Sequence, residues 1–209
     1  MLRTLSIAAA LVGLAATLPA QTPTYPDTFK VGYYSTGACV GAGPNNSGIC
    51  NQPPAGPDTT VYITNVGTQT GTTADPSGDL CAMIYVFEPD QQLAECCGCI
   101  ITPDGLLTLS VHRNLTSNPL TGTTLINGAI KIVSSIPGIS PCNAAKPVPA
   151  AGIRAWVTHF QDPPSDFLTE TPFSDATLSA GELSNLATEC KILQTEGSGA
   201  GICRCGNGG

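Results

Sequence analysis

The stretch LCAMIYVFEPDQQLAECCGC, residues 80–99, decides the fold because it joins an unbroken apolar segment to three closely spaced cysteines. Both alternating faces of residues 80–87 are apolar, which is typical of a central β-strand covered on both sides. Pro89 and Asp90 then predict a short turn or helix that runs through Ala94 into the cysteine cluster. The stretch therefore predicts a sheet that is packed on both faces, with covalent anchors close to its central strand.

Ten cysteines occur in the chain, and all of them follow an N-terminal segment that we expect to be an export signal. An even number of cysteines in an exported chain predicts a disulfide framework. The cysteines assigned to this framework are Cys39, Cys50, Cys81, Cys96, Cys97, Cys99, Cys142, Cys190, Cys203 and Cys205.

Neighbouring cysteines rarely bridge each other, because the short peptide link strains the disulfide geometry. The three cysteines of the cluster are therefore expected to bridge three different partners, with the individual pairing left open. These partners are Cys190, Cys203 and Cys205. Such bridges would clamp the C-terminal segment to the loop after the central strand.

The remaining cysteines predict a local bridge between Cys39 and Cys50, which leaves Cys81 and Cys142 by elimination. Two alternatives stay open for the clustered cysteines. The cluster (Cys96, Cys97 and Cys99) and the C-terminal tail (Cys203 and Cys205) can supply four thiolates for a metal ion, although their spacing differs from the common zinc pattern. Cys96 and Cys99 have the spacing of a redox motif but lack its βαβ context. Bridges are the favoured interpretation, and no metal or other cofactor is predicted.

Residues 1–20 predict a secretory signal, with Arg3 before an apolar run and cleavage after Ala20, or alternatively after Ala15. No second apolar run reaches the ~18 residues of a membrane span, so none is expected after signal removal. Residues 21–58 are expected to form an arm and a Pro/Gly-rich loop, and residues 59–209 a disulfide-rich domain.

The composition limits the possible partners. Charged residues make up 11% of the chain, against ~25% in ordinary soluble domains. The formal net charge of −7 argues against binding to nucleic acid or to anionic membranes. The 23 glycines and 18 prolines are typical of turns and short strands rather than long helices.

Alternating and β-branched segments predict a mainly β fold, an antiparallel β-sandwich of about six to eight strands. The predicted strands are residues 28–35, 59–66, 80–87, 107–111, 128–136, 153–160 and a short one near 167–171. The rest of residues 161–178 is expected to be irregular.

One helix is predicted for residues 180–195, and it should be stapled to the sandwich. Ser179 and Glu182 form a capping box before it, and Gly197 is a natural stop after it. Its apolar face, which should pack on a sheet, carries residues at helical spacing: Leu183, Leu186, Cys190 and Leu193.

Catalytic motifs are scarce. His112 and His159 each lie on a predicted strand, and the chain contains no GxSxG, HExxH or phosphate-binding glycine motif. Glu170 and Asp175 lie in a predicted loop, with Asp162 and Asp166 nearby. Paired carboxylates are the groups that glycoside hydrolysis uses, but exposed loop acids are far more common.

Residues 79–105, 107–122 and 169–179 and the ending GSGAGICRC (197–205) resemble a set of uncharacterised, secreted, cysteine-rich bacterial proteins. The resemblance covers most of the chain from about residue 60, and the segment 21–58 lies outside it. It implies export and a shared disulfide framework, and it implies no activity and no catalytic residue.

Three functions are consistent with these observations. The favoured one is a secreted, non-enzymatic structural or interaction protein, whose partners are cell-surface components or other copies of itself. In one version Thr28–Ser35 adds as a strand to a neighbouring copy. The second function, a small-molecule or carbohydrate binder, predicts exposed tyrosines among Tyr33, Tyr34, Tyr62 and Tyr85. The third, an exported hydrolase, predicts a histidine beside a carboxylate in a cleft.

Overall fold

A computed structural model of the chain describes residues 23–36, 49–50, 58–71, 77–138, 142–160 and 168–206. The expected signal at residues 1–20 and the expected bridge from Cys39 lie outside these residues. Nine strands form two antiparallel sheets, and one helix, α1 (Ala180–Glu196), follows the last strand. The predicted β-sandwich with a C-terminal helix is confirmed.

The five-stranded sheet has the order β11-β1-β8-β4-β5. Its strands, in that order, are Ser174–Ser179, Thr24–Ser35, Asn127–Ser135, Leu80–Phe87 and Leu93–Ile101. The four-stranded sheet has the order β10-β9-β3-β6, and its strands are Leu168–Pro172, Ile153–Phe160, Thr60–Asn65 and Leu106–Ser110. A separate short ribbon pairs β2 (Ile49–Cys50) with β7 (Thr124–Leu125).

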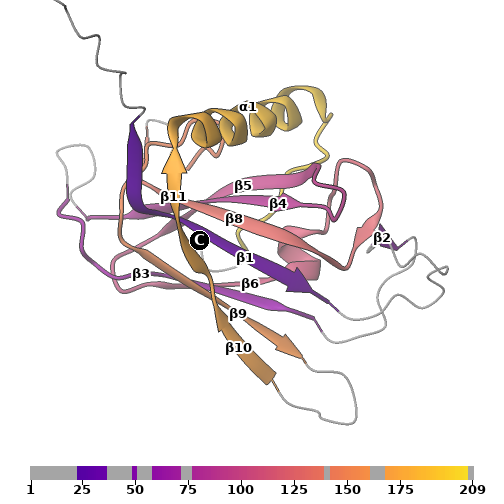
Figure 1. The fold of residues 1–209 in the computed structure, drawn as a ribbon, viewed down its shortest axis with the longest axis horizontal. Coiled ribbons are helices and arrows are strands. Elements are labelled where there is room, and N and C mark those ends of the chain that lie inside the picture. Colours follow the sequence, from indigo (N-terminus) through magenta and orange to yellow (C-terminus); the bar gives the residue numbers. More distant parts are fainter. Residues whose placement is uncertain are drawn as a thin grey trace, which may run out of the picture.

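The molecule has three layers, with the five-stranded sheet between α1 and the four-stranded sheet (Figure 1). Strand β4 contributes side chains to both interfaces, because successive residues of a strand point to opposite faces. Ala82 and Ile84 belong to the core between the sheets, and Met83 and Tyr85 belong to the core under α1. The predicted central strand, buried on both faces, is therefore confirmed with its predicted bounds.

The cysteine cluster lies on strand β5 itself, which corrects the expectation that it sits in a loop or short helix after the central strand. The turn is confined to residues 89–91, and a new strand begins at Leu93. Alternation along β5 then points Cys96 toward α1, and Cys97 and Cys99 toward the other sheet.

Four disulfides join the described cysteines. They are Cys81–Cys142, Cys96–Cys190, Cys97–Cys203 and Cys99–Cys205. Each cysteine of the cluster has a different partner in the helix or the tail, as the sequence predicted. The alternation on β5 decides which partner each one takes: the helix on one face and the tail on the other.

The tail also covers the outer edge of β5, which is the last strand of its sheet. The Cys96 amide donates to the carbonyl oxygen of Gly201 at 2.9 Å, and the Cys203 amide donates to the carbonyl oxygen of Cys96 at 3.3 Å. Ile202 thus forms a parallel bridge with Cys96. Backbone groups that would otherwise invite another strand are paired within the chain.

The helix begins and ends as its sequence predicts. The Ser179 side chain accepts from the Glu182 amide at 3.1 Å. The Glu182 carboxylate accepts from Lys131 at 2.7 Å, and no hydrogen bond from the Ser179 amide to Glu182 completes the predicted capping box within the described residues. Gly197 ends the helix, where its amide donates to the Leu193 carbonyl oxygen.

Strand β1, which the sequence set apart as an arm within residues 21–58, lies inside the five-stranded sheet. It pairs with β8 on one side and with β11 on the other. Residues 174–178 belong to the stretch 161–178 that the sequence predicts to be irregular, yet they form most of strand β11 (Ser174–Ser179). Its pairing with β1 makes it a strand, and local sequence does not carry that information.

Glycine at position 98 is required by the packing of the segment that carries Cys142. A Cβ at residue 98 would lie 2.3 Å from the carbonyl oxygen of Cys142. We expect Gly98→Ala to lower the free energy of unfolding by about 3 kcal/mol, because backbone on both sides must move.

The matched control is Gly181→Ala in the first turn of α1, where the nearest atom to a new Cβ is 3.8 Å away. Alanine favours helix there, so the free energy of unfolding should rise by about 0.5 kcal/mol. Urea unfolding of both variants measures the two effects. Equal stability of the two variants would contradict the close approach at Gly98.

Candidate functional site

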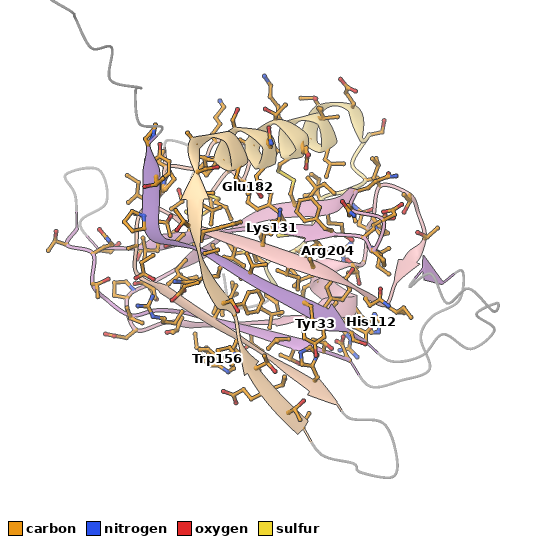
Figure 2. The ribbon with its side chains drawn as sticks, viewed as in Figure 1. Tyr33, His112, Lys131, Trp156, Glu182 and Arg204 are labelled. Atoms are coloured by element: carbon orange, nitrogen blue, oxygen red, sulfur yellow. A yellow bond between two sulfur atoms is a disulfide. The ribbon has the colours of Figure 1, made fainter. Side chains whose placement is uncertain are left out.

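The outer face of the four-stranded sheet, which points away from α1, carries the one tryptophan of the chain (Figure 2). Tyr62 on β3 lies directly opposite Trp156 on β9, and their rings stack at 5.6 Å between centroids with 13° between planes. Both side chains are partly exposed. Four of the neighbouring outward positions are hydroxyl-bearing: Thr60, Thr64, Thr108 and Thr158. We call this surface the aromatic face.

Strand alternation positions both rings. Val61 and Ile63 are fully buried between the sheets, so Tyr62 points outward. Val157 is likewise buried, which turns Trp156 to the same outer surface. Alternation along each strand predicts the direction in which its side chains point. It could not show that the two strands are neighbours, because they are about 90 residues apart.

A pocket of about 440 Å³ opens beside Trp156, where β10 leaves one sheet and β11 enters the other. Its walls combine aromatic and charged side chains: Lys30, Arg154, Trp156, Glu170, Phe173 and Asp175. Most binding sites for small molecules are concave and partly apolar, with a few polar groups that fix orientation. This pocket has that character.

A chain of ion pairs forms one wall of the pocket. Lys30, whose side chain is only 1% exposed, contacts Asp27 at 2.6 Å and also Asp175. Arg154 donates from Nη1 to both oxygens of Asp27, at 3.0 and 3.1 Å. The hydrogen bond from Lys30 lowers the pKa of the Asp27 carboxyl, and Arg154 adds to this against the opposing effect of burial. The buried Lys30 charge is therefore compensated on two sides.

Asp27 reaches this position through a local irregularity of β1. Its φ is +54°, and the pairing register with β11 shifts between Tyr25 and Phe29. Asp tolerates the left-handed region better than most residues, and a bulge redirects a side chain. The irregular backbone thus directs Asp27 toward Lys30 and Arg154.

The two acids singled out in the sequence line the same pocket. Glu170 lies on β10 and Asp175 on β11, so both are on strands rather than in a loop. Asp175 is bound to Lys30, whereas Glu170 has no hydrogen-bond or ion-pair partner among the described residues. The two carboxylates are therefore not an equivalent pair, and Asp162 and Asp166 lie outside the described residues.

Neither histidine contacts a carboxylate within the described part of the chain through its ring. His112 lies in a one-turn π-helix, η1 (Val111–Leu115), and not on a strand, and its buried Nε2 has no partner there. His159 is on β9 as expected, and neither of its ring nitrogens has a described partner. It stacks on Tyr33 at 4.6 Å, and burial lowers the pKa of its imidazole.

The tyrosines divide into two groups. Tyr34 and Tyr85 are fully buried, and burial is the main cause that raises the pKa of each phenol. Tyr33 is 57% exposed. Tyr62, which lies on the aromatic face, is partly exposed. The hypothesis of a small-molecule or carbohydrate binder requires at least one accessible tyrosine ring, and Tyr33 and Tyr62 meet that requirement.

Comparison with known proteins gives no relative: no family model, curated protein or solved structure matches the chain. None of the helices in the described residues is both long and apolar enough to cross a membrane. The four disulfides indicate an oxidising environment for the folded chain.

Proposed function

We propose that this chain is an exported, non-catalytic interaction protein that binds surface carbohydrate through the aromatic face. One observation carries the proposal: the Tyr62–Trp156 stack lies beside a pocket lined by both signs of charge. The expected export signal and the disulfide framework support an extracellular setting.

The chemistry of the aromatic face suits a sugar ring. An aromatic surface offers a large, rigid, apolar contact area, which matches the C–H face of a pyranose. The surrounding threonine hydroxyls can donate to or accept from sugar hydroxyls, and the Glu170 carboxylate, which has no partner among the described residues, can accept from them. The row Thr108, Tyr62, Trp156 and Pro172 runs across all four strands and presents a continuous strip to a chain-like ligand.

Two other functions have less support. Hydrolysis by an acid pair would need two available carboxylates, but Asp175 is neutralised by Lys30. Donation of residues 28–35 to a neighbouring copy would require β1 to break its pairing with β8 and with β11. Sedimentation of the concentrated chain tests that version, and strictly monomeric protein would exclude it.

Trp156→Ala tests the proposal, because it removes the larger ring of the aromatic face. Retention of the chain on insoluble cellulose, chitin and peptidoglycan identifies the polysaccharide, and calorimetry with its soluble oligosaccharides gives the affinity. We expect Trp156→Ala to weaken binding at least about tenfold, since the stacking contact is lost.

Tyr33→Ala is the matched control, because it removes an exposed aromatic ring away from the aromatic face. It should leave the affinity unchanged. Circular dichroism must show that both variants keep the parent fold. The proposal is wrong if none of the three polysaccharides retains the parent chain, or if the two variants weaken binding equally.

A further inference from the structure

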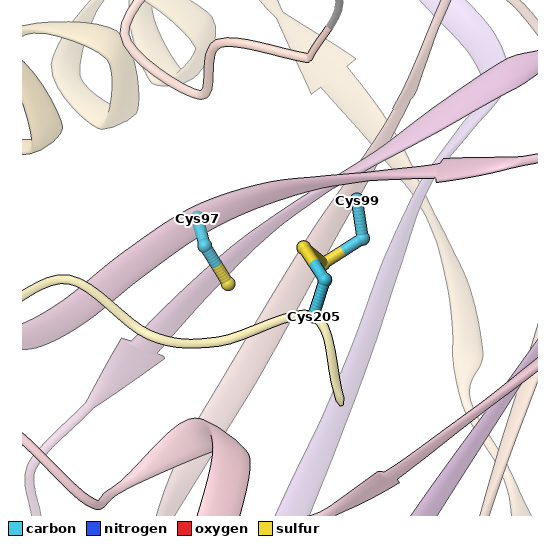
Figure 3. A group of neighbouring side chains, drawn as sticks. All are labelled: Cys97, Cys99 and Cys205. Carbon is cyan, nitrogen blue, oxygen red and sulfur yellow. A yellow bond between two sulfur atoms is a disulfide. The ribbon is translucent and has the colours of Figure 1, made fainter. Parts of the chain in front are cut away.

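Two disulfides on the inner face of β5 lie side by side. The Sγ atoms of Cys97, Cys99 and Cys205 are all within 4.8 Å of one another, although they belong to two different bridges. The fourth sulfur, of Cys203, is bonded to that of Cys97. Figure 3 shows Cys97 and Cys99 projecting from the β5 ribbon toward the tail, where Cys205 meets them.

The arrangement follows from two Cys-x-Cys pairs that face each other. Cys97 and Cys99 share one face of β5 because they are two residues apart. The tail runs parallel to β5 and brings Cys203 and Cys205 opposite them, with Cα–Cα distances of 5.2 and 5.4 Å. Three sulfur atoms from two backbone segments therefore lie together, and the fourth, of Cys203, is held next to them by its bond to Cys97.

The fold brings these cysteines together in space, although their spacing in the sequence differs from the common zinc pattern. A structural zinc site uses four thiolates at ~2.3 Å from the ion, which places the sulfur atoms roughly 3.8 Å apart in a tetrahedron. The Sγ of Cys97 lies within 4.8 Å of the two bonded sulfur atoms of Cys99 and Cys205, so the three can be brought to that separation once the bond is reduced. Reduction of each S–S bond leaves its two sulfur atoms on facing backbone segments, where side-chain rotation can direct both toward one ion.

We propose that reduction of these two disulfides creates a four-thiolate site for one Zn²⁺ or another soft divalent ion. The four ligands are Cys97, Cys99, Cys203 and Cys205. Each S–S bond takes up two electrons and two protons from a dithiol, which is itself oxidised to a disulfide. The ion then displaces the four thiol protons and forms four metal–sulfur bonds.

The surroundings suit such a site. Cys97, Cys99 and Cys203 are each no more than 7% exposed, so the ion would be shielded from water. The tail would remain fixed against β5 either by two disulfides or by one ion, so the edge of the sheet stays covered in both redox states.

Cobalt titration of the reduced chain tests the proposal. The purified chain is reduced with a dithiol, the dithiol is removed without oxygen, and Co²⁺ is added. We expect one equivalent of Co²⁺ to give the visible and thiolate charge-transfer absorption of a tetrahedral sulfur site, which Zn²⁺ then displaces. The oxidised chain should give neither band.

Alkylation of the zinc-loaded, reduced chain, followed by peptide mapping, identifies the ligands even if a variant fails to fold. Zn²⁺ should slow the alkylation of the four proposed ligands, whereas alkylation of the partly exposed Cys142 should be the same with and without Zn²⁺. Cys203→Ser with Cys205→Ser should abolish the cobalt bands, whereas Cys81→Ser with Cys142→Ser should keep them. Absent cobalt bands, protection of other cysteines, or bands that survive loss of both tail cysteines would each overturn the proposal.

Discussion

Replacing Cys96 and Cys190 together by alanine is expected to lower the free energy of unfolding by about 3 kcal/mol. The sequence separation of 94 residues alone would suggest a larger loss, about 4.7 kcal/mol, from the entropy of the unfolded chain. The difference arises because the Cys97–Cys203 bridge starts one residue away and already closes almost the same loop.

With that second bridge intact, the unfolded chain gains freedom only in a ring of roughly 15 residues, which is the basis of the smaller value. The same argument applies to the two tail bridges, which enclose a still smaller ring between them. Removal of either tail bridge alone should therefore cost about 2 kcal/mol.

Removal of all three bridges should cost about 2–3 kcal/mol more than the three separate losses combined, because only then is the long loop released. Guanidinium unfolding without reductant, on the three double variants and on the variant lacking all six cysteines, measures this excess. Strictly additive losses would show that the bridges act independently, contrary to the nested arrangement. If the variant lacking all six cysteines does not fold, the variants that lack two of the three bridges measure the same excess for each pair of bridges.

Local sequence patterns gave the elements whose signals are contained in one segment. Residues 80–87 are apolar on both faces, and the strand has those bounds and is buried on both faces. Ser179 and Gly197 delimit the helix because capping is decided by the residues at the ends. The expected partners of the cysteine cluster, Cys190, Cys203 and Cys205, are also found, because the chain contains few other cysteines that could bridge to it.

Features that depend on contacts between distant segments escaped prediction. The aromatic face requires Tyr62 and Trp156 to be neighbours across two strands, and only the pairing of β3 with β9 shows this. The pocket requires Lys30 and Asp175 to meet through the pairing of β1 with β11. Asp175 lies in a polar segment that has no strand signal of its own, so its sequence suggested a solvated loop acid.

The described disulfides and the aromatic face belong to different sheets of the molecule. The helix, the tail and all four described disulfides contact the five-stranded sheet, and none of these bridges involves a strand of the four-stranded sheet. None of the four described disulfides therefore lies on the outer side of the four-stranded sheet, where the aromatic face is. A binding face on a rigid sheet loses little conformational entropy when a ligand binds.

Glu95→Gln is expected to stabilise the protein at alkaline pH by up to about 4 kcal/mol and to leave stability near pH 4 almost unchanged. Glu95 is fully buried beside the tail, and its Oε1 accepts from the Asn118 amide at 2.7 Å. Its Oε2 has no hydrogen-bond partner within the described ranges. Burial raises the pKa of this carboxyl to about 8, even though Asn118 and Arg204 act in the opposite direction.

The direction of the pH dependence follows from the raised pKa. Below the ordinary glutamate pKa of about 4.5, both the folded and the unfolded chain carry the proton, so the group has no effect on stability. Between that value and about 8 the unfolded chain releases the proton while the folded chain keeps it, so the free energy of unfolding falls as the pH rises. Glutamine matches the shape of the protonated acid and does not titrate, so the variant should lack this decline.

Guanidinium unfolding of the parent and of Glu95→Gln at a series of pH values from 4 to 9, without reductant, measures the effect. Glu189→Gln, at an exposed position of α1, is the matched control and should keep the slope of the parent. The backbone amide of Asn118 donates to Glu95, and the side-chain amide of Asn118 donates to the Gly199 carbonyl oxygen. The charge on Glu95 therefore acts where the tail is held. Parallel pH profiles for the parent and Glu95→Gln would show that this carboxyl is already ionised in the folded protein, and the raised pKa would then be wrong.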